Sequence, residues 1–104
     1  MKEATYSLAL VRKIKDLFPG CIVLKNDPEL LQGFPDLTIL YGKRWAVLEV
    51  KGDRFAVHQP NQDYYVELCE GMSKGAFIFP ENEAAILDEL TRHFRPRTRR
   101  AVNA

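Results

Sequence analysis

Three charged residues stand at the ends of two apolar segments. Asp36 opens the segment 36–41 (DLTILY), and Glu49 and Lys51 close the segment 45–51 (WAVLEVK). Two carboxylates a few Å apart repel each other, and a hard divalent cation such as Mg²⁺ relieves that repulsion. Such a cation can position a water molecule and neutralise charge on a phosphate group, and a nearby ammonium can stabilise the same charge. These residue types therefore favour metal-assisted hydrolysis of a phosphate ester.

The two segments that carry these charges are predicted to be neighbouring strands. Gly42-Lys43-Arg44 joins them and has the length of a hairpin turn. Because side chains alternate along a strand, Glu49 and Lys51 point to the same face, and the hairpin brings Asp36 back beside them. The spacing thus predicts one cluster of the three side chains. A cross-strand ion pair on a solvated face is the alternative explanation of Glu49 and Lys51.

The remaining elements follow from apolar periodicity and from turn residues. We expect helices over 4–18 (with Ala4, Leu8, Val11 and Ile14 apolar), from Gln59-Pro60 to about 70, and over 81–94 (with Ala84, Ala85, Leu87 and Leu90 inward), and strands over 21–25 and 75–80. Pro60 is expected at the first helical position, and Tyr64 and Leu68 in the core. Strands 45–51 and 75–80 flank a helix, so they should be parallel.

The expected architecture is an α/β fold in the order αβββαβα, with a mixed sheet of about four strands flanked by helices. A chain of 104 residues with 46% hydrophobic and 28% charged residues suits a single domain, placed here over residues 1–94. No apolar run approaches the roughly 20 residues of a membrane span. Charges interrupt the N-terminal segment every few residues, so it lacks the apolar region of a signal peptide. We therefore expect a cytoplasmic protein without a membrane partner or a small-molecule cofactor. Cys21 and Cys69 are expected to be buried free thiols, because no spacing supports a disulfide or a metal pair.

The charge is unevenly distributed. Residues 1–91 carry 10 Lys and Arg against 14 Asp and Glu, whereas residues 92–104 carry five Arg and no acid. Residues 95–104 are expected to be a basic tail that contacts nucleic acid; a merely solvated end is the alternative. In the loop after Lys51, Arg54 and His58 are further candidates, and Lys43 and Arg44 are expected to be solvated charges far from the cluster. The predicted nucleic-acid contacts are Arg54, His58, Arg95, Arg97, Arg99 and Arg100.

The pattern Pro35-Asp36 with Glu49-Val50-Lys51 resembles the PD-(D/E)xK nuclease superfamily. Within it the chain is most similar to the VRR-NUC group, whose small stand-alone members occur in bacteriophages. The Gly-x-Pro-Asp lead-in at Gly33 and the segment Gln59-Pro60-Asn61-Gln62 look like motifs of that group, with Gln59 in place of the usual serine. Holliday junction resolvases share the Asp-to-Glu spacing and the Glu-Val-Lys. The resemblance covers roughly residues 3–80.

This resemblance implies a restriction-endonuclease-like fold and DNA phosphodiester hydrolysis that depends on Mg²⁺, with Mn²⁺ as a substitute. It implies Asp36 and Glu49 as metal ligands, with Glu3 at the start of the first helix; the carbonyl of Val50, at its strand end, is a further ligand candidate. Lys51 would orient the water or stabilise charge. Gln62 would contact Lys51, the water or the DNA. Alternatively, Glu3 only complements the dipole of the first helix. The alternative for Gln62 is a position on the helix surface without a role in the site.

The expected function is that of a metal-dependent endonuclease selective for branched, junction or flap DNA, because no sequence-reading module is visible. A homodimer would place two active sites on two strands. Two alternatives stay open: a catalytically silent regulator that binds nucleic acid or protein, and an RNA-directed nuclease.

Overall fold

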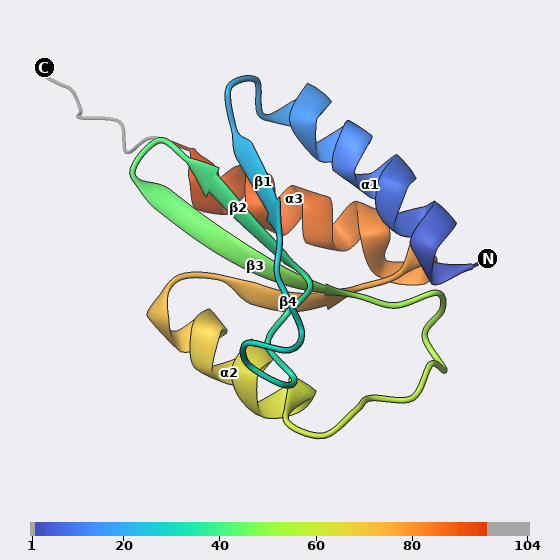
Figure 1. The fold of residues 1–104 in the computed structure, drawn as a ribbon. Coiled ribbons are helices and arrows are strands. Elements are labelled where there is room, and N and C mark those ends of the chain that lie inside the picture. Colours follow the sequence, from blue (N-terminus) through green and yellow to red (C-terminus); the bar gives the residue numbers. More distant parts are fainter. Residues whose placement is uncertain (1, 96–104) are drawn as a thin grey trace, which may run out of the picture.

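The computed structural model describes residues 2–95 of the chain. Its elements are α1 (Glu3–Leu17), β1 (Ile22–Lys25), β2 (Leu37–Tyr41), β3 (Arg44–Val50), α2 (Gln62–Met72), β4 (Gly75–Ile78), the short 3₁₀ helix η1 (Pro80–Asn82) and α3 (Glu83–Phe94) (Figure 1). The predicted α/β class and element order are confirmed.

The four strands form one mixed sheet in the order β1-β2-β3-β4. The pairs β1–β2 and β2–β3 are antiparallel, with Tyr41 opposite Arg44 at the hairpin. Strand β4 returns through α2 and pairs with β3 in parallel, as the connection predicts. The carboxyl end of β3 and the start of β2 therefore lie at the same edge of the sheet.

Helices cover both faces of the sheet: α1 and α3 pack on one face and α2 lies on the other (Figure 1). Strand β3 divides its side chains between the two layers. Ala46, Leu48 and Val50 belong to the main core with α1 and α3, whereas Val47 and Glu49 alternate to the α2 face. Because β3 is flanked by strands and covered on both faces, its second half is buried.

The facing of two helices differs from the prediction. In α1 the buried residues are Tyr6, Leu10 and Ile14, while Leu8 is 67% exposed. In α3 the buried residues are Ile86, Leu90 and Phe94, and Ala84 and Ala85 lie outside. Each helix has apolar residues on more than one side, and the larger aromatic and branched side chains fill the core. Ile14 and Leu90 are buried as predicted. A second apolar stripe of α1 consists of the exposed Leu8 and of Val11, which is partly buried against the core as expected.

The start of α2 also differs from the prediction. Pro60 is not the first helical residue, because Asn61 has a left-handed φ of 73° and the helix begins at Gln62. A left-handed residue cannot continue into a right-handed helix, so the turn ends before the helix starts. The helix passes Gly71 and ends at Met72. Tyr64 and Leu68, expected in the core, are 60% and 42% exposed.

Arg44 is not a solvated charge. Its Nη1 donates hydrogen bonds to the carbonyl oxygens of His93, at 2.7 Å, and Arg95, at 2.9 Å. The guanidinium satisfies carbonyls at the end of α3, where a helix leaves them without partners. This contact fixes the end of α3 beside the β2–β3 hairpin, away from the opposite edge of the sheet.

Two further expectations concern the cysteines and the membrane. Cys21 and Cys69 are free, as predicted; Cys69 is buried as expected, but Cys21 is only partly buried. No helix within residues 2–95 has the length and apolar character needed to cross a membrane.

Candidate active site

Asp36 lies immediately before β2 and is bonded to the end of β3. Its Oδ2 accepts a hydrogen bond of 3.0 Å from the backbone N–H of Val50. Its own carbonyl accepts from the backbone N–H of Asn26 at 2.7 Å, and the side chain of Asn26 donates to the carbonyl of Pro35. The segment before β2 is thus held from both sides, which fixes the Asp36 carboxylate near Glu49.

Glu49 is an acid inside the protein, with only 2% of its surface exposed. Its Oε2 accepts a hydrogen bond of 2.9 Å from Nε2 of Gln62, but its Oε1 is buried without any partner among residues 2–95. Burial, followed by the negative charge of Asp36, raises the pKa of Glu49 from 4.5 to about 8, although Lys51 acts in the opposite direction. A hydrogen bond that a protonated Glu49 shares with the Asp36 carboxylate adds to the rise. A buried acid with a raised pKa and an unused oxygen is typical of a functional site.

Lys51 and Glu49 are connected through Gln62. Lys51 is 5% exposed, and its Nζ donates to Oε1 of Gln62 at 2.8 Å and to the carbonyl of Val57 at 3.1 Å. The same Nζ lies 3.7 Å from Oε2 of Glu49. Gln62 therefore accepts from the lysine with one end of its amide and donates to the glutamate with the other, which holds both side chains in place.

The loop before Asp36 packs directly on the turn that precedes α2. Gly33 has a φ of +88°, and a Cβ built on it would lie 2.6 Å from both Cβ of Asn61 and the carbonyl oxygen of Pro60. Only a glycine fits such a contact. Glycine at 33 thus allows the chain around Asp36 and the chain that starts Gln62 to approach each other, although the two segments are far apart in sequence.

Glu3 and Val50 line a small cavity of about 130 Å³ together with Asp36. Glu3 is exposed at the first turn of α1. Within residues 2–95, no three His, Cys, Asp or Glu side chains gather closely enough to hold a metal ion alone, so Glu3 is not part of a three-acid group. Mg²⁺ commonly needs only one or two protein carboxylates and completes its shell with water and phosphate oxygens. Asp36 and the free oxygen of Glu49 fit such a site.

The predicted nucleic-acid contacts are not gathered at one place. Arg54 is exposed in the loop after Lys51, with its guanidinium 4.8 Å from the ring centroid of Phe55. The ring of His58 stacks on Phe77 at 4.0 Å, and its Nδ1 lies 2.7 Å from Oδ1 of Asp63. These contacts hold the His58 ring against β4 and α2.

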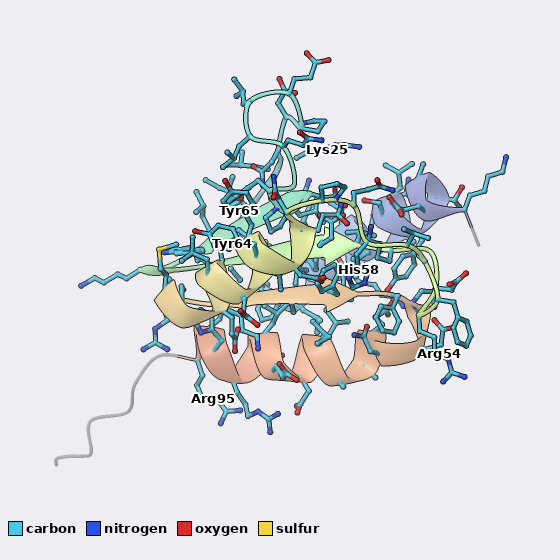
Figure 2. The ribbon with its side chains drawn as sticks, turned by 90° about the horizontal axis from the view of Figure 1, so that it is seen from below. Lys25, Arg54, His58, Tyr64, Tyr65 and Arg95 are labelled. Atoms are coloured by element: carbon cyan, nitrogen blue, oxygen red, sulfur yellow. The ribbon has the colours of Figure 1, made fainter. Side chains whose placement is uncertain are left out.

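Arg95 lies far from the carboxylates of Asp36 and Glu49. It follows α3 at the hairpin end, and Figure 2 shows Arg54 and Arg95 at opposite ends of the molecule. Arg97, Arg99 and Arg100 lie outside the described residues. The structure therefore does not bring Arg95 to the carboxylates.

The sequence interpretation did not assign a role to Lys25, Ser7 or Asn26. Lys25 and Ser7 line the cavity that contains Asp36, and Asn26 bonds the segment around Asp36. Pairing of β1 with β2 places Lys25 opposite Leu37, next to Asp36. An explicit register for the first hairpin would have revealed this position.

Comparison of the chain with protein-family models, with curated proteins and with solved structures gave no match. The functional interpretation therefore rests on the residues and contacts described above.

Proposed function

We propose that this chain is a Mg²⁺-dependent endonuclease, with Mn²⁺ as a substitute, that hydrolyses DNA phosphodiester bonds on a restriction-endonuclease-like fold of the PD-(D/E)xK type. The observation that carries the proposal is the buried carboxyl pair of Glu49 and Asp36: Oε1 of Glu49 has no donor group within residues 2–95, and burial and Asp36 raise the Glu49 pKa to about 8. A carboxylate kept out of water beside a second carboxylate lowers the stability of the fold. A role in binding a cation explains why such an arrangement is present.

In this proposal the residues near Asp36 have separate roles in binding the metal ion and in catalysis. Asp36, Glu49 and the carbonyl of Val50 would hold the metal ion. Glu3 lines the cavity of Asp36 and Val50, and Glu49 lies outside that lining, on the α2 side of β3. The bound cation would supply an activated water and neutralise charge on the phosphate. Lys51 uses two of its N–H groups on Gln62 and Val57, so the third can donate to the attacking water or to a phosphate oxygen. Hydrolysis of this type leaves 5′-phosphate and 3′-hydroxyl ends.

Two other functions are compatible with the fold. A catalytically silent regulator would have no need for the buried pair Glu49 and Lys51, so the pair favours the enzyme. An RNA-directed nuclease could use the same side chains. We propose branched, junction or flap DNA as the substrate because no sequence-reading element is evident, and Arg54 in the exposed loop as a phosphate contact.

Replacing Lys51 with Met should lower cleavage by roughly 10²–10³-fold, because the ammonium that stabilises the developing charge is lost. The assay follows labelled duplex, four-way junction, flap and single-stranded DNA and RNA with Mg²⁺, Mn²⁺ or EDTA. Lys43→Met is the matched control, because Lys43 is exposed at the hairpin turn. This variant should cleave DNA as fast as the wild type does.

The outcomes separate the alternatives. Metal-dependent cutting of DNA that Lys51→Met removes would support the proposal. Cutting of RNA in preference to every DNA would favour the RNA-directed enzyme. A wild type that cuts nothing but binds tightly in EDTA would be a regulator, and the nuclease proposal would be abandoned.

We also propose that two copies pair through the face of the sheet that α2 leaves open. Exposed apolar residues lie on β1, β2 and α2: Ile22, Leu24, Leu40, Tyr64 and Leu68 are each between 39% and 60% exposed. Ile22 and Leu40 are direct cross-strand partners, and α2 makes its sheet contacts with β3 and β4. Apolar groups collected on one face commonly mark an interface.

Leu24→Glu is expected to convert the dimer into a monomer, because a carboxylate would be placed in the apolar contact. Sedimentation equilibrium measures the molar mass of wild type and variant, and Lys43→Glu serves as the exposed control. A wild type that is monomeric at all concentrations would contradict this pairing.

A further inference from the structure

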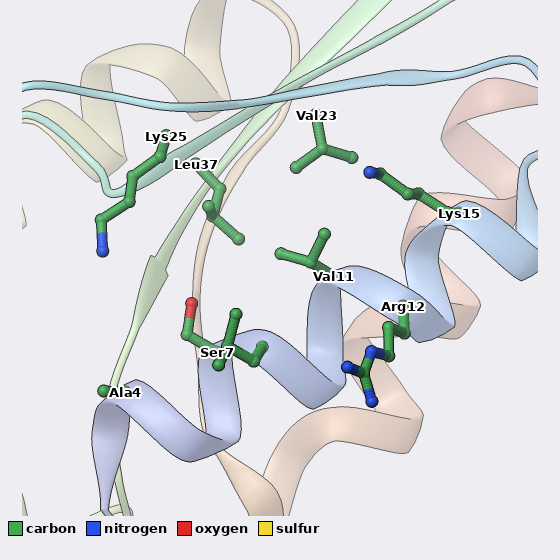
Figure 3. Close-up of a pocket in the computed structure, with 9 residues that line it drawn as sticks. Ala4, Ser7, Val11, Arg12, Lys15, Val23, Lys25 and Leu37 are labelled. Atoms are coloured by element: carbon green, nitrogen blue, oxygen red, sulfur yellow. The ribbon is translucent and has the colours of Figure 1, made fainter.

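A cavity of about 520 Å³ lies between α1 and β1, at the edge of the core: Leu37 belongs to the core, and Val11 and Val23 pack against it. Its walls are apolar: Leu8 and Val11 come from the second stripe of α1, and Val23 and Leu37 come from the sheet. Figure 3 shows Val11 and Val23 pointing toward each other across the gap. This volume falls in the range of sites that take small ligands or one part of a larger one.

Cations surround these walls. Arg12, Lys15 and Lys25 line the cavity, and Lys15 and Lys25 stand on opposite sides of it (Figure 3). None of the ion pairs within residues 2–95 includes any of the three, although Lys13 on the same helix is paired with Glu83. The rim therefore carries positive charge without an ion pair among residues 2–95, and the acids that line the smaller cavity together with Lys25 are Glu3 and Asp36.

The cavity leads to the candidate metal site. Ala4, Ser7 and Lys25 line both this cavity and the smaller one that contains Asp36 and Val50. A nucleic-acid strand whose phosphate lies at Asp36 would reach the apolar walls of the larger cavity with its next nucleotides. Lys25 stands where the two cavities meet.

We propose that this cavity, the α1–β1 groove, binds a single-stranded segment of the nucleic acid beside the scissile phosphate. The inference rests on the proposed nuclease function and names its substrate as one with an unpaired strand next to the cut. Apolar walls suit the face of an unstacked base, and the cationic rim suits the phosphates on either side. A duplex presents phosphates but keeps its base faces stacked, so it would leave the apolar walls without a partner.

The test measures binding in EDTA, where nothing is cut, with fluorescein-labelled oligothymidylate and a labelled duplex as probes. Fluorescence anisotropy at several salt concentrations gives the affinity and its salt slope. Lys25→Ala should weaken binding of the single strand and lower the slope by about 0.7, the value for one lost phosphate contact. Lys43→Ala, an exposed lysine at the hairpin, should leave both quantities at wild-type values.

Leu8→Ser isolates the apolar contact. Leu8 is largely exposed, so the variant should fold normally. Its affinity for the single strand should fall several-fold without a change in salt slope, and its affinity for the duplex should not change.

Each result decides between distinct conclusions. If Lys25→Ala and Leu8→Ser bind the single strand like the wild type while the wild type cleaves DNA with Mg²⁺, the groove proposal is wrong and the nuclease proposal stands. Equal losses on duplex and single strand would overturn the assignment to unpaired DNA. A wild type that neither binds nor cleaves any nucleic acid would overturn both proposals.

Discussion

Glu49→Gln is expected to abolish metal-dependent cleavage and, in EDTA, to stabilise the fold. The neutral amide is a poor ligand for a hard cation. Loss of several kcal/mol of transition-state stabilisation corresponds to a rate decrease on the order of 10³-fold. The substitution keeps the size of the side chain, and the new amide oxygen can still accept the hydrogen bond from Gln62. Stability in EDTA near pH 8 should rise, because burial and the neighbouring Asp36 disfavour the ionised Glu49 more than Lys51 favours it, and the amide cannot ionise.

The pH dependence of unfolding reports the same group. With a pKa raised from 4.5 to about 8, folded Glu49 keeps a proton that the unfolded chain has already released. The wild type in EDTA should therefore lose stability as the pH rises between these values, by up to roughly 1 kcal/mol per pH unit. Glu49→Gln removes this slope. Mg²⁺ should stabilise the wild type more at about pH 8 than at about pH 5, because only the ionised pair binds the cation well.

Urea unfolding of the wild type and of Glu49→Gln between about pH 5 and pH 8, with and without Mg²⁺, measures the free energy of unfolding. Glu67→Gln is the matched control, because Glu67 is exposed on α2 and should keep the wild-type slope and activity. If Glu49→Gln unfolds like the wild type at about pH 8 in EDTA, Glu49 carries no buried charge, and the argument from its unpartnered oxygen fails.

Gly33→Ala should destabilise the protein by about 3 kcal/mol or more, from left-handed backbone strain and from steric overlap together. The added Cβ would meet Asn61 and Pro60 at 2.6 Å, where the nearest atoms include main chain. The turn before α2 would have to move, and Gln62 would move with it. Cleavage should fall even at temperatures where the variant remains folded, because Gln62 orients both Lys51 and Glu49.

Gly20→Ala separates strain from overlap. Gly20 has a φ of +90°, close to the +88° of Gly33, but a Cβ on it would meet nothing within 4 Å. Gly20→Ala should therefore lower the free energy of unfolding by only about 1–2 kcal/mol and leave the cleavage rate unchanged. Thermal and urea unfolding compare the two variants; equal losses for Gly20→Ala and Gly33→Ala would show that the contact with Asn61 contributes nothing.

The order of elements was predictable because it depends on local signals. Apolar runs define the strands, and Gly42-Lys43-Arg44 and Pro19-Gly20 mark turns where the backbone needs them. The parallel pairing of β3 with β4 followed from the handedness rule for a crossover connection. The resulting hairpin was also enough to place Asp36 near the end of β3.

What escaped prediction depends on contacts between distant segments. Periodicity alone does not say which of two apolar stripes of α1 faces the sheet, so Leu8 was expected inside and Leu10 was overlooked. The role of Arg44 requires the end of α3, which lies 49 to 51 residues away in sequence. Likewise, the burial of Glu49 and its raised pKa depend on the α2 layer above it, which no local pattern describes.

The placement of the two ends of the described chain has a practical consequence for handling the protein. Glu3 opens α1 at the cavity of Asp36, whereas Arg95 follows α3 beside the hairpin, where Arg44 bonds its carbonyl. An affinity tag or fluorescent fusion attached ahead of Lys2 would begin at the entrance of the candidate site and compete with a substrate for space. Arg95 lies at the other extremity of the described chain, so a label on that side would leave the entrance of the candidate site free.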